Sequence, residues 1–239
     1  MAVRMTFKLI PTLVYCCVLP LLITLGVWQL NRAEEKQIFL KMQEQRLQSE
    51  VIVLKPDTPV DLVLLKYSKV SVAGHYDNAH QFLLDNQINA GVVGYFVLTP
   101  FVLEGSDKTV LVNRGWIPLK DRTQLPQITV TDTPTTLLGR INSFPGVGLK
   151  LSGAEMPSKN WPSVVGVVDS AVLSATLGYP LLPFQIELAD TQPNGYQRDW
   201  QQTTLMRPEQ HTAYAVQWFA LALVLTVLFI RYSFKKVND

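Results

Sequence analysis

The chain has 239 residues, which is enough for one sizeable domain or two small ones. Its hydrophobic fraction is 48 %, and the excess is concentrated in two segments near the ends. The net charge of +2 is small, and no basic stripe lies outside the flanks of those segments, which argues against nucleic-acid binding. The cysteines, Cys16 and Cys17, are adjacent in the first apolar segment, whereas a metal clip needs a turn between its ligands.

The first apolar segment, residues 9–30, has close to the roughly 20 residues that a helix needs to cross a bilayer core. A signal peptide would have a shorter apolar core and then small residues at a cleavage site, but this segment ends around the bulky Trp28. We therefore expect an uncleaved transmembrane helix, in which Pro20 is tolerated as a kink. Residues 1–8 contain basic residues and no acid, which predicts a cytoplasmic N-terminus.

The second apolar segment, residues 211–230, also has spanning length and contains no charged residue. The basic residues that follow it, in 231–239, predict a cytoplasmic C-terminus by the positive-inside rule. Everything between the two spans is then extracytoplasmic. Because no Arg- and Ser-rich presequence precedes the first span, we expect a bacterial inner membrane and a periplasmic domain.

Between the spans the character of the sequence changes once. Residues 31–54 are mostly polar, with mixed charges and no Gly or Pro, and they predict a helical extension of the first span. Residues 55–210 consist of short apolar stretches divided by Gly, Pro, Asn and Asp, which is typical of strands and turns. The expected fold is thus a membrane protein of the α+β class, in which two transmembrane helices bracket a mainly antiparallel, barrel- or sandwich-like β domain.

The expected elements of the β domain are short. Residues 169–177 predict one helix, with Asp169 as its N-cap. Residues 85–87 and 104–107 resemble hairpin connections. The expected strands lie near 66–76, 81–84, 92–103, 109–116, 136–144, 163–168, 183–189 and 203–207.

The strongest candidate for a ligand site is His211, at the outer end of the second span. On a helix, His211, Tyr214 and Trp218 are spaced to share one face. A neutral imidazole with aromatic walls and nearby guanidinium groups supplies what a haem needs, namely an axial nitrogen, an apolar slot and cations for the propionates. The alternative is an interfacial histidine that backbone groups or lipid headgroups satisfy.

Two further pairs of residues are candidates for binding. Trp28 and Arg32 lie at the outer end of the first span with helical spacing, on an edge that also contains Gln29, and this edge is expected to pack beside His211 and complete a pocket between the helices. Interfacial anchoring explains them equally. Arg114 and Trp116 lie at the end of an expected strand. They either anchor a protein partner or have only a structural role in the strand and the turn that follows it.

The sequence favours a protein that is not an enzyme. It contains no GxxxxGK[ST], HExxH or GxSxG motif. His75 and His80 flank an expected turn, and no activated Ser or Cys motif accompanies them. We therefore expect both to be polar surface residues.

Short motifs along nearly the whole chain resemble the Surfeit-locus protein 1 family, the assembly factors for cytochrome c oxidase. The motifs occur in a fixed order, on the two-span layout described above. They are Gly26-Val27-Trp28-Gln29-Leu30-Asn31-Arg32, Leu84-Asp85-Asn86-Gln87, Gly94-Tyr95, Leu98-Thr99-Pro100, Val112-Asn113-Arg114-Gly115-Trp116-Ile117-Pro118, Gly139-Arg140, Pro193-Asn194-Gly195 and His211-Thr212-Ala213-Tyr214-Ala215-Val216-Gln217-Trp218-Phe219.

The resemblance implies a function for the chain. It implies a factor that binds haem a and assists its insertion into the catalytic subunit of cytochrome c oxidase, with His211 at the position of the family's haem-associated histidine. Membrane lipid and the catalytic subunit are the implied partners, and haem a synthase is a further candidate. The alternative is a scaffold without cofactor, which stabilises an intermediate of oxidase assembly through its domain and spans.

Overall fold

The computed structural model describes all residues except 1–2, 6–7, 132, 147–151, 201–205 and 237–239. The chain divides into two compact units. One contains residues 1–44 together with 202–239, and the other contains residues 45–201.

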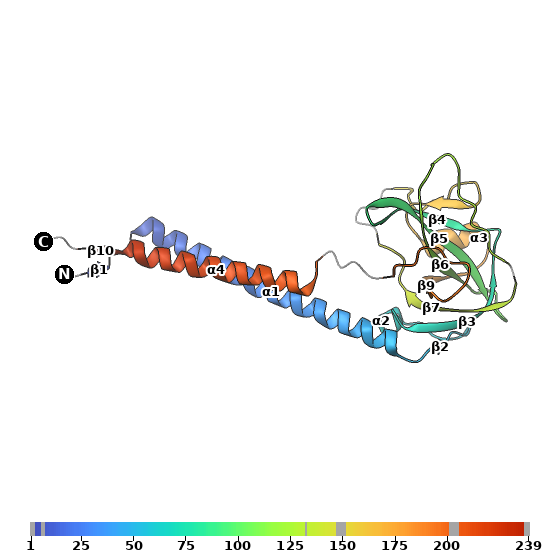
Figure 1. Ribbon diagram of the computed structural model, residues 1–239, viewed down its shortest axis with the longest axis horizontal. Helices are drawn as coiled ribbons and strands as arrows, with labels where there is room; N and C mark the ends of the chain where they lie inside the picture. Colours follow the sequence, from blue (N-terminus) through green and yellow to red (C-terminus); the bar gives the residue numbers. More distant parts are fainter. Residues whose placement is uncertain (1–2, 6–7, 132, 147–151, 201–205, 237–239) are drawn as a thin grey trace. The chain divides into compact units, whose positions relative to one another are not determined.

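The first unit is a pair of long helices, α1 (Leu9–Gln48) and α4 (Pro208–Ser233). Both are long and apolar enough to cross a membrane, as the sequence predicts. They lie side by side in opposite directions (Figure 1), and beyond them the short strands β1 (Val3–Met5) and β10 (Phe234–Lys236) pair antiparallel. Helix α1 continues without a break through most of the expected extension, and its last residues belong to the second unit.

The seam between the two helices is formed by small and aromatic side chains. Gly26 lies so close to the Phe219 ring that a Cβ placed on it would come within 2.6 Å of a ring carbon. At the other end, the Tyr15 and Phe229 rings stack with their centroids 4.2 Å apart, and the Tyr15 hydroxyl lies 3.2 Å from the Thr226 hydroxyl. Close backbone approach at small residues is the usual basis of helix packing in lipid.

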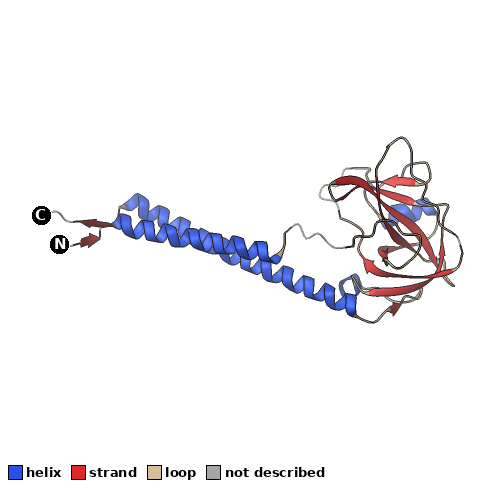
Figure 2. Ribbon diagram, in the orientation of Figure 1, coloured by secondary structure: helices blue, strands red, loops and turns tan. Residues whose placement is uncertain are grey.

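The second unit is mostly β-structure (Figure 2). Its described elements are β2 (Ile52–Val53), α2 (Leu62–Leu65), β3 (Lys69–Tyr76), β4 (Phe82–Asn89), β5 (Val92–Leu103), β6 (Thr109–Pro118), β7 (Thr135–Asn142), β8 (Ser163–Val165), α3 (Ser170–Leu177) and β9 (Leu181–Leu188).

Five of the described strands close into a barrel. The sheet order is β2-β3-β7-β9-β6-β5-β4-β8, and β3 also pairs with the end of β5, which joins the two sides. Around the barrel the strands follow one another as β3, β5, β6, β9 and β7. In chain order these are the first, second, third, fifth and fourth strands of the barrel. Their only parallel pair among the described residues is β6 with β9. This is the strand order of an OB-type Greek-key barrel, which confirms the expected barrel-like domain.

Alternating apolar residues of these strands fill the barrel. The core includes Val70, Val72, Phe101, Val112 and Ile186, all at most 1 % exposed. A second cluster packs α3 against β4, β5 and β6 through Leu173, which is fully buried. Asp169 caps α3 as expected, because its carboxylate accepts hydrogen bonds from the backbone N–H groups of residues 171 and 172.

Several expected boundaries were wrong. The hairpin connection expected at 85–87 is a β-bulge inside β4, where the register with β5 shifts and Asn86 has φ 57°. The turn follows at Ala90 and Gly91, which both have positive φ. An Asp-Asn pair suits a bulge as well as a turn, since Asn tolerates positive φ in both.

Two other expectations need correction or fall outside the description. The helical extension ends at Gln48 instead of 54, because β2 forms there and pairs parallel with β3. The strand expected at 203–207 lies mostly outside the described residues, because these exclude 201–205.

Candidate ligand site in the helix pair

His211 faces the seam between α1 and α4. Its Nδ1 lies 2.7 Å from the side-chain oxygen of Gln29. Both residues are nearly buried, with 7 % of His211 and 9 % of Gln29 exposed. One polar contact therefore joins the predicted outer ends of the two spans, although the two residues are far apart in the sequence.

Local sequence sets the position of His211 on its helix. Helix α4 begins at Pro208, a residue that suits the first helical position because it has no N–H to lose. The Gln210 side chain accepts a hydrogen bond from the backbone N–H of Arg207 at 2.8 Å, as in a capping box. With this start fixed, His211 and Ala215, one turn later, point into the seam, and Ala215 is fully buried.

The contact with Gln29 determines which imidazole nitrogen is free. An amide oxygen accepts hydrogen bonds, so Nδ1 carries the proton and donates it. The lone pair of a neutral imidazole is then on Nε2. Within the described parts of the chain, Nε2 has no hydrogen-bond partner. His211 is thus a histidine with one nitrogen held by the protein and one without a described partner.

The other predicted residues of this site lie on the outside of the helix pair. Tyr214 is 45 % exposed and Trp28 is 47 % exposed, whereas Trp218 is half-buried. The Arg32 guanidinium lies 5.7 Å from the Trp28 ring and donates to Glu35 at 2.7 Å. Their exposure places Tyr214 and Trp28 away from the seam.

The seam itself is close-packed near this site, because Gly26 and Phe219 are in contact about one helical turn from Gln29. The residue types suit a haem: an imidazole whose second nitrogen has no described partner, exposed aromatic side chains, and a guanidinium for a carboxylate.

Gln29 lies on the edge of the first span that was expected beside His211, but it was not predicted to bind anything, although a signal for that exists in the sequence. It is a polar residue at the end of an apolar span, where a side-chain amide requires a partner. Gly26 lies three residues before Gln29, and Ala33 lies four residues after it. All three therefore lie on the buried face of α1, where Gln29 is flanked by small residues. That pattern, together with the single histidine of the second span, would have predicted a contact between Gln29 and His211.

The second candidate pair, Arg114 and Trp116, lies inside the barrel domain. Arg114 is 1 % exposed, and its guanidinium donates to the backbone carbonyls of Asn194 at 2.7 Å and Ile128 at 2.8 Å. It also donates to the side chains of Gln81 at 2.9 Å and Thr99 at 3.3 Å. Its bonds join segments from four parts of the chain.

Trp116 is also buried, and its Nε1 donates to the carbonyl of Gln87 at 2.8 Å. The indole packs on Gly94, where a Cβ would come within 2.5 Å of it. These bonds supply a structural role for both residues. The partner-interface hypothesis for Arg114 and Trp116 stays a prediction, and it requires contact through neighbouring residues, since the two side chains are covered.

Burial shifts the pKa values around Arg114. Burial lowers the pKa of the guanidinium, and the Tyr196 and Tyr76 side chains partly offset this. Burial raises the pKa of Tyr76 to about 12, against the opposing effects of Arg114 and Arg198. The Tyr76 hydroxyl therefore stays neutral. Arg114 remains a buried cation, and its hydrogen bonds to neutral acceptors stabilise it.

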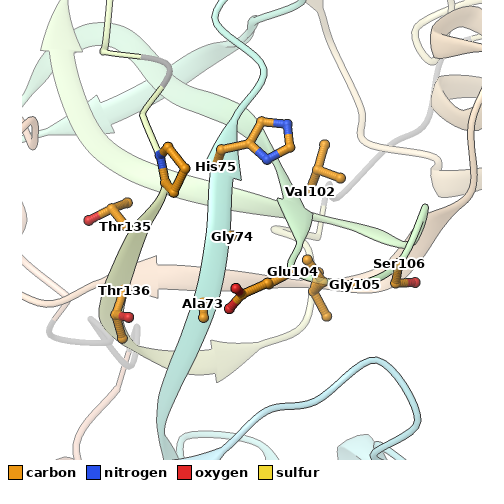
Figure 3. Close-up of a pocket in the computed structure, with 11 residues that line it drawn as sticks. Ala73, Gly74, His75, Val102, Glu104, Gly105, Ser106, Thr135 and Thr136 are labelled. Atoms are coloured by element: carbon orange, nitrogen blue, oxygen red, sulfur yellow. The ribbon is translucent and has the colours of Figure 1, made fainter.

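The two remaining histidines lie elsewhere in the barrel domain. His75 is exposed beside an open hollow of about 540 Å³ on β3, and Figure 3 shows its ring at one end of the hollow and the Glu104 carboxylate further along. The His80 Nδ1 lies 2.7 Å from the Asp77 carboxylate, which also accepts a bond from Tyr179 at 2.6 Å. No group of three or more His, Cys, Asp or Glu suited to a metal occurs among the described residues.

These features define a membrane protein of the α+β class, in which two apolar helices bracket an OB-type barrel. The model of the SURF1 family matches residues 16–223. The chain therefore belongs to the SURF1 family, which is known generally for cytochrome oxidase assembly factors.

Curated relatives agree with this assignment. A SURF1-like protein of Rickettsia bellii is 27 % identical over 225 residues, which cover 89 % of this chain and 86 % of the relative. Surfeit locus protein 1 of Xenopus tropicalis is 26 % identical over 231 residues, covering 90 % and 73 %. Surfeit locus protein 1 of Arabidopsis thaliana is 38 % identical over 105 residues, covering 39 % and 30 %.

Proposed function

We propose that this chain binds haem a at His211 and assists its insertion into the catalytic subunit of cytochrome c oxidase. The observation that carries the proposal is the state of His211: Gln29 holds Nδ1, and Nε2 has no partner in the described parts of the chain. The catalytic subunit is the proposed recipient, and haem a synthase is a candidate donor. The chain acts as an assembly factor and not as an enzyme.

The surroundings of His211 suit this cargo. Haem a has a long hydrocarbon tail and two propionates, so a carrier must offer it lipid and water together. His211 lies near the start of an apolar helix, where the two media meet. Exposed Trp28 and Tyr214 offer apolar surface, and Arg32 offers a cation for a propionate.

The experiment is to measure haem per protein in the detergent-solubilised full chain after co-production with haem a. We expect His211→Ala to lose most of the haem. His75→Ala is the matched control, because it removes an exposed histidine that lies in the other unit, and it should retain the haem. If His211→Ala binds haem a as tightly as the parent, with an unshifted absorption spectrum, His211 is not the ligand.

A scaffold without cofactor is the second candidate function, and one observation favours it. The buried bond between His211 and Gln29 would also serve a helix pair that needs no ligand. In that case the parent would carry no haem a, and His211→Ala would lower both the stability of the helix pair and the amount of assembled oxidase.

The orientation of the chain is part of the proposal. The basic flanks outside both helices predict that both termini are cytoplasmic and that the barrel is periplasmic, in a bacterial inner membrane. A reporter that is active only in the cytoplasm should be active after Asp239 and silent at Gly105, in the exposed β5–β6 turn. The reverse pattern would overturn the proposed site of haem binding.

A further inference from the structure

We propose that Gln29 is a positioning residue for His211. Its side-chain oxygen keeps the imidazole in the tautomer and orientation that leave Nε2 to the iron. This inference rests on the proposed function, in which His211 binds haem a, and it adds a second helix to the site.

The bond between the two residues has the geometry that such a role needs. The distance of 2.7 Å between Nδ1 and the amide oxygen is short, and both side chains are at least nine-tenths buried. A buried amide in a low-dielectric seam is costly without a partner, so the bond holds both side chains in place. His211 could otherwise rotate about its χ angles and carry its proton on either nitrogen.

Close packing of the helices makes the bond possible. Gly26 and Ala33 lie on either side of Gln29 on the same face of α1, and Ala215 lies one turn from His211 on α4. Small side chains at these points allow the backbones to approach, so that a Gln side chain reaches the ring. An Asn at position 29 is one methylene shorter and would not reach.

A partner on the second ring nitrogen is how proteins commonly orient metal-binding histidines. It fixes the tautomer and raises the basicity of the ligating nitrogen, and its loss typically weakens metal affinity 10- to 100-fold. Because the partner here belongs to the other span, iron binding at His211 also depends on how α1 and α4 pack.

The first test reads the tautomer without any haem. In the full chain labelled with ¹⁵N-histidine, the His211 signals are those that disappear in His211→Ala. We expect Nδ1 to carry the proton in the parent. Gln29→Met, which keeps the length of the side chain but removes the acceptor, should shift the signals towards a mixture of tautomers. A parent protein with the proton on Nε2 overturns the inference.

The second test measures affinity for haem a by titration of the same variants. We expect Gln29→Met and Gln29→Asn to bind about 10- to 100-fold more weakly than the parent. Gln29→Glu, which restores an acceptor of the right length, should recover most of the affinity. Gln43→Met is the matched control, since Gln43 is equally buried on α1 but lies about 21 Å further along the helix.

The outcomes separate this inference from the proposed function. If His211→Ala loses haem while Gln29→Met binds as the parent does, only the positioning role is overturned. If neither variant changes the affinity, the proposed ligand is wrong and the inference fails with it. Loss in Gln29→Met with recovery in Gln29→Glu supports positioning, because a purely packing role would favour Met at least as much as Glu.

Discussion

His211 and Arg114 are both buried polar side chains, one in the helix pair and one in the barrel, and they differ in how fully they are used. Arg114 donates to four acceptors from four parts of the chain. His211 makes one side-chain bond, to Gln29, and leaves a nitrogen without a described partner. A buried group whose bonds are spread over several segments holds a fold together, whereas one with spare capacity can bind something else.

The difference follows from the two architectures. Barrel strands are joined by loops whose backbone carbonyls are free to turn inward, and Arg114 binds two of them, at Ile128 and Asn194. In a pair of apolar helices the backbone groups are satisfied within each helix, so only side chains can pair across the seam. A polar residue there has few partners within the protein.

The largest expected effect is from Arg114→Ala. Removing the guanidinium takes a donor from the buried Ile128 carbonyl and from Gln81 and Thr99, although Gln81 still accepts from the Thr99 hydroxyl, and each buried acceptor left unsatisfied costs about 1–3 kcal/mol. Because the costly burial of the cation is also removed, we expect a net loss of about 3–5 kcal/mol in the free energy of unfolding, enough to threaten the fold of the barrel. Thermal unfolding of the solubilised chain measures it.

Arg114→Lys refines this prediction. The lysine keeps the charge but cannot reach the carbonyls of Ile128 and Asn194 together with Gln81, so it should recover only part of the stability. If Arg114→Ala melts like the parent and yet loses association with the oxidase, the structural role is wrong and the partner-interface hypothesis gains.

The second prediction concerns the helix seam. Gly26→Val places a branched side chain against the Phe219 ring, where even a Cβ would come within 2.6 Å. Overpacking of this kind costs about 1–3 kcal/mol, and it should separate the helices enough to weaken the bond between Gln29 and His211. A lower melting temperature and shifted His211 nitrogen signals are the expected results.

Phe219→Leu provides the control for this prediction. Combined with Gly26→Val, the smaller Leu side chain should relieve the clash and restore both measurements towards those of the parent. A Gly26→Val protein that is unchanged in both measurements would mean that the two helices do not pack at this point.

The elements with a strong periodic signal could be predicted from the sequence. Both apolar helices, the strand at 92–103 and the capped helix at 170–177 lie where the pattern placed them. The bulge at Asn86 could not be predicted, because its residues suit a bulge and a turn equally well. Only pairing with the neighbouring strand β5 decides which of the two forms. The closure of the barrel depends on pairing between β3 and β5, which no local pattern specifies.

The candidate site shows the same division. The position of His211 at a predicted membrane boundary made it a candidate from the sequence alone. Helical spacing also grouped it with Tyr214 and Trp218, but the direction of the seam puts His211 inward and Tyr214 outward. Gln29 was expected on the edge beside His211, but its bond to the imidazole became evident only from the contact between the two helices, which the spacing within either helix does not contain.

A third and smaller effect is expected from Trp116→Phe. The change removes one hydrogen bond, from Nε1 to the Gln87 carbonyl, and keeps most of the aromatic contact with Gly94. We expect a loss of about 1 kcal/mol in the free energy of unfolding. A loss as large as that of Arg114→Ala would show that Trp116 contributes more than this bond.

The smallest expected effect is a pH dependence at Asp77, whose carboxylate is bonded at the rim of the barrel. Burial raises its pKa, but hydrogen bonds from Tyr179 and His80, the His80 charge and the Ala79 N–H outweigh burial, so the pKa is lowered from the ordinary value of 3.8. A lowered folded-state pKa gives stability that is present above the unfolded value and lost as the pH falls through the folded one.

Asp77→Asn should therefore melt below the parent at pH 7, and the gap between the two should narrow as the pH is lowered from about 5 to below the ordinary aspartate value of about 3.9. Asp57→Asn is the control, because the Asp57 side chain is fully exposed, and it should follow the parent at every pH. Melting temperatures measured across this range decide the matter. A gap that stays constant with pH would mean that Asp77 acts through hydrogen bonds that its amide replacement loses at any pH, and not through its charge.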